Sequence, residues 1–456
     1  MADFDVLVIG GGTGNNVAAA AADAGLETAL VEPGPLGGTC LNRGCNPSKM
    51  LVQAANAANQ VRDAGRFHVD ATLEGVDHAA VVDEMDDLLG GIAADMEARY
   101  REKENLTLFE QRTRFVDERT VELDGESVSG ERVVVAAGSR PIVPPIDGLE
   151  GIDYLTSRDA LYRREPPDSL VVLGGGYIAV ELGYVFESVG TDVTVVEMED
   201  SLVPREDGDV ADAFTEFAAD RHDVYTGYRV TAVEEVGDGH AVHAEAEAGD
   251  ELTVEGSEVL VALGRRPNGD TLDLEAAGID VDDRGFVETN EYLETTAENV
   301  WAQGDVAGNA PFKHAGDYET RHTIANAVRG ERRAVDLSAM PHAIFTEPQI
   351  AGVGATEEEL DERGIEYVTG RANYGDSAMG RAKKLEGGFT KVLAAPDGEI
   401  LGAHAIGYEA STLLHEAVLA MRTGLTVDEV AGTIHAHPTL SKVVEAAFRD
   451  ARNRTA

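Results

Sequence analysis

The sequence is short of several residue types, and each shortage excludes something. Only two cysteines occur among 456 residues, Cys40 and Cys45. A chain of this length buries large cores without a disulfide framework, so the pair needs a chemical reason. No apolar run reaches the ~18 residues of a membrane-spanning helix. No charged, apolar leader opens the chain, so we expect a soluble cytoplasmic protein, in which such a pair predicts catalysis.

Positive charge is also scarce. The chain has 37 Lys and Arg, only seven of them lysines, against 84 Asp and Glu, which gives a net charge of −47. Such a chain repels nucleic acid and anionic membranes, so neither is expected as a partner. The acids are spread along the sequence, which suits molar salt, where a Debye length of about 3 Å screens repulsion. We interpret the excess as a halophilic surface and predict no metal site.

The chain does contain one internal repeat. Each copy reads as an apolar strand, a glycine-rich turn, a helix and a second strand that ends in an acid. The first copy runs from FDVLVIG to Glu32, and the second runs from SLVVLG to Glu197. This is the βαβ pattern of a dinucleotide-binding unit. Its glycines let backbone N–H groups approach a pyrophosphate, and its acid accepts hydrogen bonds from a ribose. The glycines are Gly10, Gly12 and Gly14, and in the second copy Gly174 and Gly176.

Neither copy has glycine at the third fingerprint position. Asn15 stands there in the first copy, and Ala179 stands there in the second. Alanine is a permitted substitute, whereas Asn15 is expected to loosen the contact between helix and strand without removing the phosphate site. Each copy closes with a further apolar strand that stops at a glycine, Gly138 or Gly264.

Three further segments complete the pattern. Apolar periodicity over 77–104 predicts a packing helix, with a break expected, if anywhere, at Gly90 and Gly91. The strand NVWAQG presents Asp305, a carboxylate suited to polyol or ribose hydroxyls. From about Met340, strand patterns and an amphipathic helix indicate a domain of α+β type. The expected fold class is therefore α/β, with two Rossmann-like dinucleotide-binding domains and a C-terminal α+β domain.

Four motifs together resemble the class I, FAD-dependent pyridine nucleotide–disulfide oxidoreductases, the family of dihydrolipoamide dehydrogenase, glutathione reductase and mercuric reductase. GGTCLNRGCNPSK resembles the redox-active motif, GGGYIAVELG the nicotinamide motif, WAQGDVAG the second flavin motif, and HAHPTLS the C-terminal histidine motif. The resemblance covers essentially the whole chain. It implies an FAD-binding domain over 1–148 and 270–336, an NAD(P)-binding domain over 149–269 and a dimerisation domain over 337–456.

The resemblance implies the cofactors and a redox pair. FAD would bind the first repeat, with Glu32 on its adenosine ribose and Asp305 on its ribityl chain, and NADPH or NADH would bind the second. A Cys40–Cys45 disulfide would take electrons from the flavin, with Cys45 facing the flavin and Cys40 attacking substrate. The cofactor contacts also include Gly10, Gly12, Gly14, Gly38, Thr39, Lys49, Gly138, Gly174, Gly176, Tyr177, Ala179, Glu197 and Gly264.

The cysteine spacing makes a local demand. A regular helix separates the two side chains, so a bridge requires an irregular turn, for which Gly44 and Pro47 are suited. A helix that begins near Cys45 would lower the pKa of its thiol.

The resemblance also implies several catalytic residues. Lys49 and Glu181 would form an ion pair beside the flavin ring, and Tyr177 would gate the nicotinamide pocket. His437 would transfer protons to and from thiolates in the partner's site, which implies a homodimer. The family has Glu five residues after this histidine, and this chain has Lys442. Glu445, one helical turn further on, is the candidate replacement; His435 is expected to be structural.

The residues beside the two cysteines indicate the kind of substrate. Arg43 and Asn46 are polar where a lipoamide enzyme has aliphatic residues, and Arg43 suits a carboxylate. The end RDARNRTA carries no thiol, which argues against mercury reduction. Acidic archaeal halophiles use γ-glutamylcysteine as their small thiol. The sharpest hypothesis is therefore an NAD(P)H-dependent bis-γ-glutamylcystine reductase serving thiol redox homeostasis.

Alternatives stay open at this point. One is dihydrolipoamide dehydrogenase, and another is a flavin redox sensor without turnover. The nicotinamide choice is also open, because Glu197 and Glu199 favour NADH whereas disulfide reductases of the family mostly use NADPH. Arg205 is the nearest arginine that a 2′-phosphate could use.

Overall fold

The computed structural model describes residues 2–455. Contacts divide the chain into two compact units. The first unit comprises Met1–Ser48, Val82–Ile142 and Gly264–Leu337, and the second comprises Lys49–Val81, Val143–Leu263 and Ser338–Ala456. The three-domain division remains a prediction. No helix within 2–455 is both long enough and apolar enough to cross a membrane.

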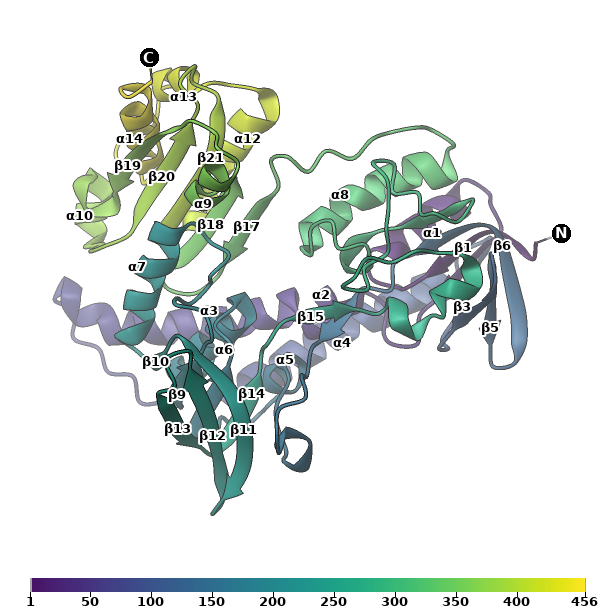
Figure 1. The fold of residues 1–456 in the computed structure, drawn as a ribbon, viewed down its shortest axis with the longest axis horizontal. Coiled ribbons are helices and arrows are strands. Elements are labelled where there is room, and N and C mark those ends of the chain that lie inside the picture. Colours follow the sequence, from purple (N-terminus) through teal and green to yellow (C-terminus); the bar gives the residue numbers. More distant parts are fainter. Residues whose placement is uncertain (1, 456) are drawn as a thin grey trace. The chain divides into compact units, whose positions relative to one another are not determined.

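The first unit has α/β architecture, built on one large sheet and a separate two-stranded pair (Figure 1). Its strands are β1 (Phe4–Ile9), β2 (Thr28–Val31), β3 (Leu106–Phe109), β4 (Arg114–Asp117), β5 (Thr120–Leu123), β6 (Glu126–Val135), β7 (Ser139–Pro141), β15 (Arg265–Pro267) and β16 (Val300–Ala302). Its helices are α1 (Gly14–Asp23), α2 (Gly38–Arg43), η3 (Gly269–Thr271), η4 (Leu274–Ala277), η5 (Gly304–Val306), α8 (Lys313–Thr323) and η6 (Ile324–Val328). Helices α3 (Cys45–Arg62) and α4 (His78–Arg101) run across the boundary between the units.

The sheet confirms the first βαβ unit. Its order is β3-β2-β1-β6-β5-β4, with β16 also paired to β6. Strands β1, β2, β3 and β16 are parallel to their neighbours on this path, and Ile9 stands opposite Val31. Parallel strands of this kind are covered on both faces, which explains their continuous apolar runs. The carboxyl ends of β1, β2 and β16 therefore lie at one edge, where the candidate acids follow.

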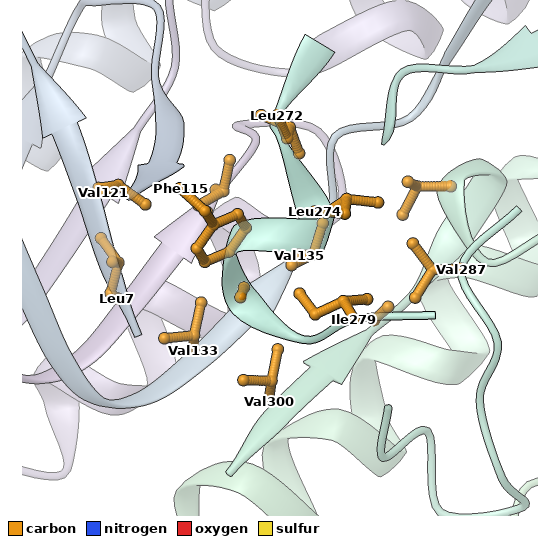
Figure 2. Packing of buried hydrophobic residues seen from close by; sticks show 14 of the residues in the cluster. Leu7, Phe115, Val121, Val133, Val135, Leu272, Leu274, Ile279, Val287 and Val300 are labelled. Atoms are coloured by element: carbon orange, nitrogen blue, oxygen red, sulfur yellow. The ribbon is translucent and has the colours of Figure 1, made fainter. Parts of the chain in front are cut away.

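The core on one face of this sheet draws on distant segments (Figure 2). Leu7 and Val133 come from the sheet, Phe115 from the β4–β5 hairpin, and Leu274 and Ile279 from the segment around η4. Phe115 is completely buried. Burial of one such side chain stabilises the fold by about 1.5–3 kcal/mol. The chain between 264 and 302 thus completes the core of the N-terminal sheet.

Helix α4 is continuous through Gly90 and Gly91, so the break expected there does not occur. Met85, Leu89 and Ala93 are buried on one face of the helix, and both glycines are exposed. A Cβ at either glycine would meet nothing within 4 Å. Burial of the apolar face holds the helix together despite two residues of low helix propensity.

The second unit contains the second repeat and the C-terminal region. Its strands are β8 (Ser169–Leu173), β9 (Asp192–Val196), β10 (Asp223–Tyr225), β11 (Tyr228–Val236), β12 (Gly239–Ala246), β13 (Glu251–Gly256), β14 (Glu258–Val261), β17 (Pro341–Ile344), β18 (Gln349–Gly354), β19 (Val368–Asn373), β20 (Phe389–Ala394) and β21 (Ile400–Gly407). Its helices are η1 (Asp63–Phe67), η2 (Leu149–Gly151), α5 (Ser157–Leu161), α6 (Tyr177–Ser188), α7 (Gly208–Ala219), α9 (Glu357–Glu362), η7 (Tyr374–Asp376), α10 (Ala378–Lys383), α11 (Ala410–Leu413), α12 (His415–Thr423), α13 (Val427–Gly432) and α14 (Ser441–Arg452).

Three sheets organise this unit. The parallel order β10-β9-β8-β14 confirms the second βαβ unit, in which α6 follows β8. Strands β11-β12-β13 form an antiparallel sheet, and β17-β18-β21-β20-β19 form another in the C-terminal region. Helix α14 packs on β19 and β20. The predicted α+β character after residue 340 is therefore confirmed.

One buried ammonium joins parts of this unit that are far apart in sequence. Lys391 on β20 is 1% exposed. Its Nζ lies 2.7 Å from Asp207 Oδ1, 3.0 Å from Asp209 Oδ2 and 2.6 Å from Glu357 Oε2. These carboxylates raise its pKa although burial opposes them. Lys391 thus holds the start of α7 against β20 and α9.

Candidate functional site

The two thiols lie on either side of a break between helices. Helix α2 contains Cys40 and ends at Arg43, Gly44 has a non-helical conformation, and α3 begins at Cys45. The structure therefore confirms both the irregular turn and the helix start that the spacing predicts. Cys45 is exposed and Cys40 is partly buried. A thiol at the first position of an 18-residue helix lies at its positive end, which favours the thiolate.

Cys40 interacts with Cys45 and with a polar neighbour. No disulfide joins Cys40 and Cys45, and a hydrogen bond with Cys45, together with burial, raises the pKa of Cys40. Sγ of Cys40 also lies 3.8 Å from Asn46 Oδ1. The raised pKa favours the protonated form of Cys40, so a thiolate at this position would need a base.

An ion pair follows the thiols along α3. Lys49, one turn after Cys45, places its Nζ 2.6 Å from Glu181 Oε2 on α6. Glu181 is buried, and its other oxygen accepts the backbone N–H of Phe345 at 3.0 Å. The Phe345 ring lies 4.5 Å from the Lys49 ammonium. The predicted pair is thus present as a contact, and Phe345 fixes it from a third segment.

The first glycine turn suits a dinucleotide phosphate. Gly38 lies so close to Gly12 that a Cβ on it would be 2.6 Å from Gly12 Cα. Thr13 precedes α1 without a side-chain cap, and the first turn has no acidic residue. The backbone N–H groups there are therefore open to a phosphate in a cradle free of side chains. These residues fit FAD, with Gly10, Gly12 and Gly14 forming the turn and Gly38 and Thr39 beside it.

Glu32 closes this turn from β2. Its carboxylate accepts the N–H of Gly11 at 2.7 Å and the N–H of Gly34 at 2.9 Å. Burial raises the pKa of Glu32, and these bonds and the charge of Arg43 oppose the rise. A Cβ on Gly34 would lie 2.9 Å from Nη2 of Arg43. Arg43, the predicted substrate contact, therefore has its guanidinium beside Glu32, because residue 43 ends α2 on the side that faces the β2 turn.

In the second repeat, too, the acid after the second strand accepts a backbone N–H of the glycine turn. Glu197 is buried, accepts the N–H of Gly175, and accepts the N–H of Glu199 at 2.9 Å. Helix α6 starts after Gly176 without a side-chain cap or an acid in its first turn. Tyr177 opens α6 and is partly exposed, and Ala179 is buried in it. Arg205 is exposed on the segment before α7.

Asp305 is fixed at the carboxyl end of β16. Ser139 donates to its Oδ2 at 2.5 Å, and Arg265 Nε lies 4.0 Å from the same oxygen. Arg265 also donates to Ser139 Oγ and to the Ser139 carbonyl. The β7–β15 pair thus brings the segments after Gly138 and Gly264 together beside Asp305. Ser139 and Arg265 are residues that motif reading missed.

Asn15 does not separate α1 from β1. Its Nδ2 lies 3.3 Å from Met96 Sδ, and its carbonyl accepts Tyr100 Oη at 2.9 Å, both on α4. The close approach to the sheet occurs at Gly14, where a Cβ would lie 2.9 Å from Val8 Cγ1. The expected loosening is therefore wrong, because helical phase turns Asn15 away from the strand.

The two C-terminal histidines differ in their surroundings. His437 is exposed and precedes Pro438 through a cis peptide. Glu445 pairs with Lys442 and Arg449 and lies 3.9 Å from His435 Nδ1. Spacings of three and four residues place these side chains on one face of α14. The role of Glu445 in orienting His437 stays a prediction. His435 is held by Glu416 at 2.6 Å, in keeping with a structural role.

Comparison with known proteins extends this picture. Residues 4–332 match the pyridine nucleotide-disulphide oxidoreductase family, and residues 340–448 match its dimerisation domain. A dihydrolipoyl dehydrogenase of Haloferax volcanii is 38% identical over 461 residues, covering 98% of this chain and 96% of that protein. A mycothione reductase of Mycobacterium tuberculosis is 36% identical, covering 98% and 99%.

A solved structure gives the same result. The HOCl-induced flavoprotein disulfide reductase RclA from Escherichia coli superposes with a TM-score of 0.86 at 26% identity, covering 98% of this chain and 99% of that one. The family uses FAD and NAD(P)H. The chain therefore belongs to the pyridine nucleotide-disulphide oxidoreductases, a family of NAD(P)H-dependent flavoenzymes that act on disulfides.

Proposed function

We propose that this chain is a cytoplasmic, homodimeric reductase that transfers electrons from NAD(P)H through FAD and the Cys40–Cys45 pair to bis-γ-glutamylcystine. FAD, when bound, supplies a two-electron link between the nicotinamide and the cysteine pair. The observation that carries the proposal is the hydrogen-bonded pair of thiols at the break between α2 and α3. A redox sensor without turnover would not need both thiols.

The cysteines supply the exchange chemistry. The Cys40 thiolate attacks one substrate sulfur, so a mixed disulfide forms and the first substrate thiolate leaves. Cys45 then attacks the Cys40 sulfur, the second thiolate leaves and the Cys40–Cys45 bond closes. Two electrons and two protons convert one disulfide into two thiols. We assign the proton transfers to His437, contributed across the dimer, because the raised pKa of Cys40 calls for a base.

The substrate assignment rests on polarity and salt. Asn46 beside Cys40 offers an amide to a polar substrate, and the charge of −47 suits a halophilic cell. Haloferax volcanii, the source of one relative, is such an organism, but that relative is a dihydrolipoyl dehydrogenase. Dihydrolipoamide is therefore the competing substrate, and mycothione is a third, from the mycobacterial relative.

We infer NADH as the preferred nicotinamide. Both oxygens of Glu197 are held by backbone N–H groups at the end of β9. A 2′-phosphate on the ribose would meet this buried carboxylate, whereas two hydroxyls could donate to it. Arg205 is exposed and stands eight residues beyond the acid.

The test is a substrate panel with the purified holoenzyme in molar KCl. Bis-γ-glutamylcystine, lipoamide and oxidised mycothiol are compared by kcat/KM, each with NADH and NADPH. We expect bis-γ-glutamylcystine with NADH to be fastest. Faster turnover of lipoamide would reject the assignment, and bleaching of the flavin without reduction of any disulfide would favour the sensor. Cys40→Ser is the control that should abolish all disulfide turnover.

A further inference from the structure

A lysine outside every recognised motif stands near the attacking thiol. Lys313 is the first residue of α8, and its ammonium pairs with Asp317 one turn on. The Lys313 side chain remains 35% exposed. The chain has only seven lysines in 456 residues, against 84 Asp and Glu. A partly exposed lysine beside the thiols is therefore unexpected.

Two close approaches bring α8 and α2 to the same turn. Gly38, two residues before Cys40, meets Gly12, and Gly316, three residues after Lys313, meets Thr13. A Cβ on Gly316 would lie 2.9 Å from Thr13 Cγ2. The first turns of both helices therefore converge on residues 12 and 13. In agreement with this placement, the charges of both Lys313 and Asp317 act on Cys40: the hydrogen bond with Cys45 and burial raise its pKa most, Lys313 lowers it and Asp317 raises it.

Arg43, the cation expected from the sequence to bind the substrate, has its charged group at the dinucleotide turn. Arg43 has its guanidinium beside Glu32 and Gly34, at the dinucleotide turn. A γ-glutamylcysteine disulfide carries one carboxylate on each cysteine Cα, only two carbons from the sulfur that is attacked. A cation that binds this group must therefore stand close to Cys40.

We propose that Lys313 is a specificity-determining residue, whose ammonium binds the cysteine α-carboxylate of an anionic disulfide while Cys40 attacks the adjacent sulfur. The inference rests on the proposed function and names the contact that selects its substrate. Lys313 has three N–H donors, of which Asp317 uses one, so a second carboxylate can share the ammonium. At a Debye length of about 3 Å in molar salt, only a direct contact of this kind discriminates between charged and neutral substrates.

The test compares two substrates that differ in one group. Bis-γ-glutamylcystine is matched with its analogue in which both cysteine α-carboxylates are carboxamides. The ratio of the two kcat/KM values is measured for the holoenzyme in molar KCl. We expect the wild type to prefer the acid by about tenfold and Lys313→Met to lose most of this preference, chiefly through KM. Lys313→Arg should retain it.

Two controls keep the test decisive. Lys103→Met removes another lysine that pairs with an aspartate in the first unit, Asp23, and should leave the ratio as in the wild type. Asp317→Asn frees the ammonium of one partner and should raise the preference for the acid. FAD absorbance confirms that each variant is folded.

The outcomes separate the two proposals. If wild-type enzyme reduces neither disulfide, the proposed function fails, and this inference fails with it. If it reduces both and Lys313→Met leaves their ratio unchanged, only the inference fails. A loss of rate that is equal for both substrates would show that Lys313 acts on Cys40 alone, and it would also overturn the carboxylate contact.

Discussion

Lys49 Nζ lies 2.6 Å from Glu181 Oε2, and the backbone N–H of Phe345 holds the other oxygen of that carboxylate at 3.0 Å. The lysine is therefore positioned by three segments of the second unit. Its ammonium has a buried counter-charge on one side and an aromatic face on the other. The charge that α3 carries one turn after Cys45 is thus fixed in place.

This geometry predicts opposite effects from the two members of the pair. Lys49→Met removes a positive charge and should lower the reduction potential of bound FAD, because the reduced flavin is anionic. Glu181→Gln keeps an acceptor for Phe345 but leaves Lys49 without its counter-charge, so the potential should rise. Spectroscopic titration measures both. Lys49→Arg is the matched control, and shifts of the same sign in Lys49→Met and Glu181→Gln would contradict an electrostatic role.

Substitution of Glu32 and of Glu197 should weaken the binding of different cofactors. Glu32→Ala should weaken FAD retention, since Glu32 braces the turn at Gly11. Glu197→Ala should raise the KM for NADH about tenfold and leave FAD content unchanged. FAD content is measured by absorbance after gel filtration, and KM by steady-state kinetics. If Glu197→Ala loses FAD while Glu32→Ala keeps its full FAD content, the two cofactors are assigned to the wrong repeats.

Acid should destabilise the fold through histidines that are buried or half-buried. Burial, with the charge of Arg221, lowers the pKa of His222 to about 4. Above the ordinary value of 6.5 both states are neutral, whereas between 6.5 and about 4 only the unfolded chain binds the proton. The free energy of unfolding should therefore fall as the pH drops through this window.

Comparison with variants isolates this contribution. His222→Asn should lose less stability than the wild type between pH 7 and 4.5, as measured by denaturant unfolding at constant salt. His68→Asn replaces an exposed histidine and should follow the wild-type curve. If the stability of His222→Asn falls with pH as steeply as that of the wild type, other groups cause the acid sensitivity. His78 and His404 are candidates, because burial lowers the pKa of each.

Two glycine-to-alanine substitutions should act in opposite directions. Gly91→Ala adds a methyl where nothing lies within 4 Å, in the middle of α4. It should stabilise the fold by about 0.5–1 kcal/mol. Gly14→Ala would press against Val8 at 2.9 Å and Ala136 at 3.0 Å, so it should destabilise. Thermal unfolding of the FAD-bound protein measures both, and destabilisation by Gly91→Ala would refute the open space at that position.

The sequence predicted the parts of the fold that local patterns encode. Strand periodicity and glycine turns located both βαβ units, and the spacing of Cys40 and Cys45 required the break observed at Gly44. The Lys49–Glu181 contact followed from motif resemblance, although the residues are 132 positions apart. These features depend on short segments whose geometry is the same wherever they occur.

The errors arose where helical phase decides which neighbour a side chain meets. Asn15 was predicted wrongly, because it turns to α4 and not to the strand. Arg43 lies beside Glu32, and Glu445 faces Lys442 and Arg449, which are contacts that no motif indicates; their roles toward substrate and His437 stay predictions. For Glu445 the spacing along α14 could have shown this, since three- and four-residue steps share a face. Phe345 and Lys313 carry no motif, and only the assembled chain brings them to Glu181 and Cys40.

Lys391 gathers three of the 84 acidic side chains around one ammonium in the interior. Most of the remaining acids face solvent, where dilution of the salt restores their mutual repulsion. The contact between Lys391 and Asp207 is shielded from water, although Asp209 is 46% exposed, so this contact responds much less to such dilution. Removal of salt should therefore unfold the exposed acidic segments first. Measured by amide hydrogen exchange, the contact between α7 and β20 should be among the last parts of the second unit to lose protection.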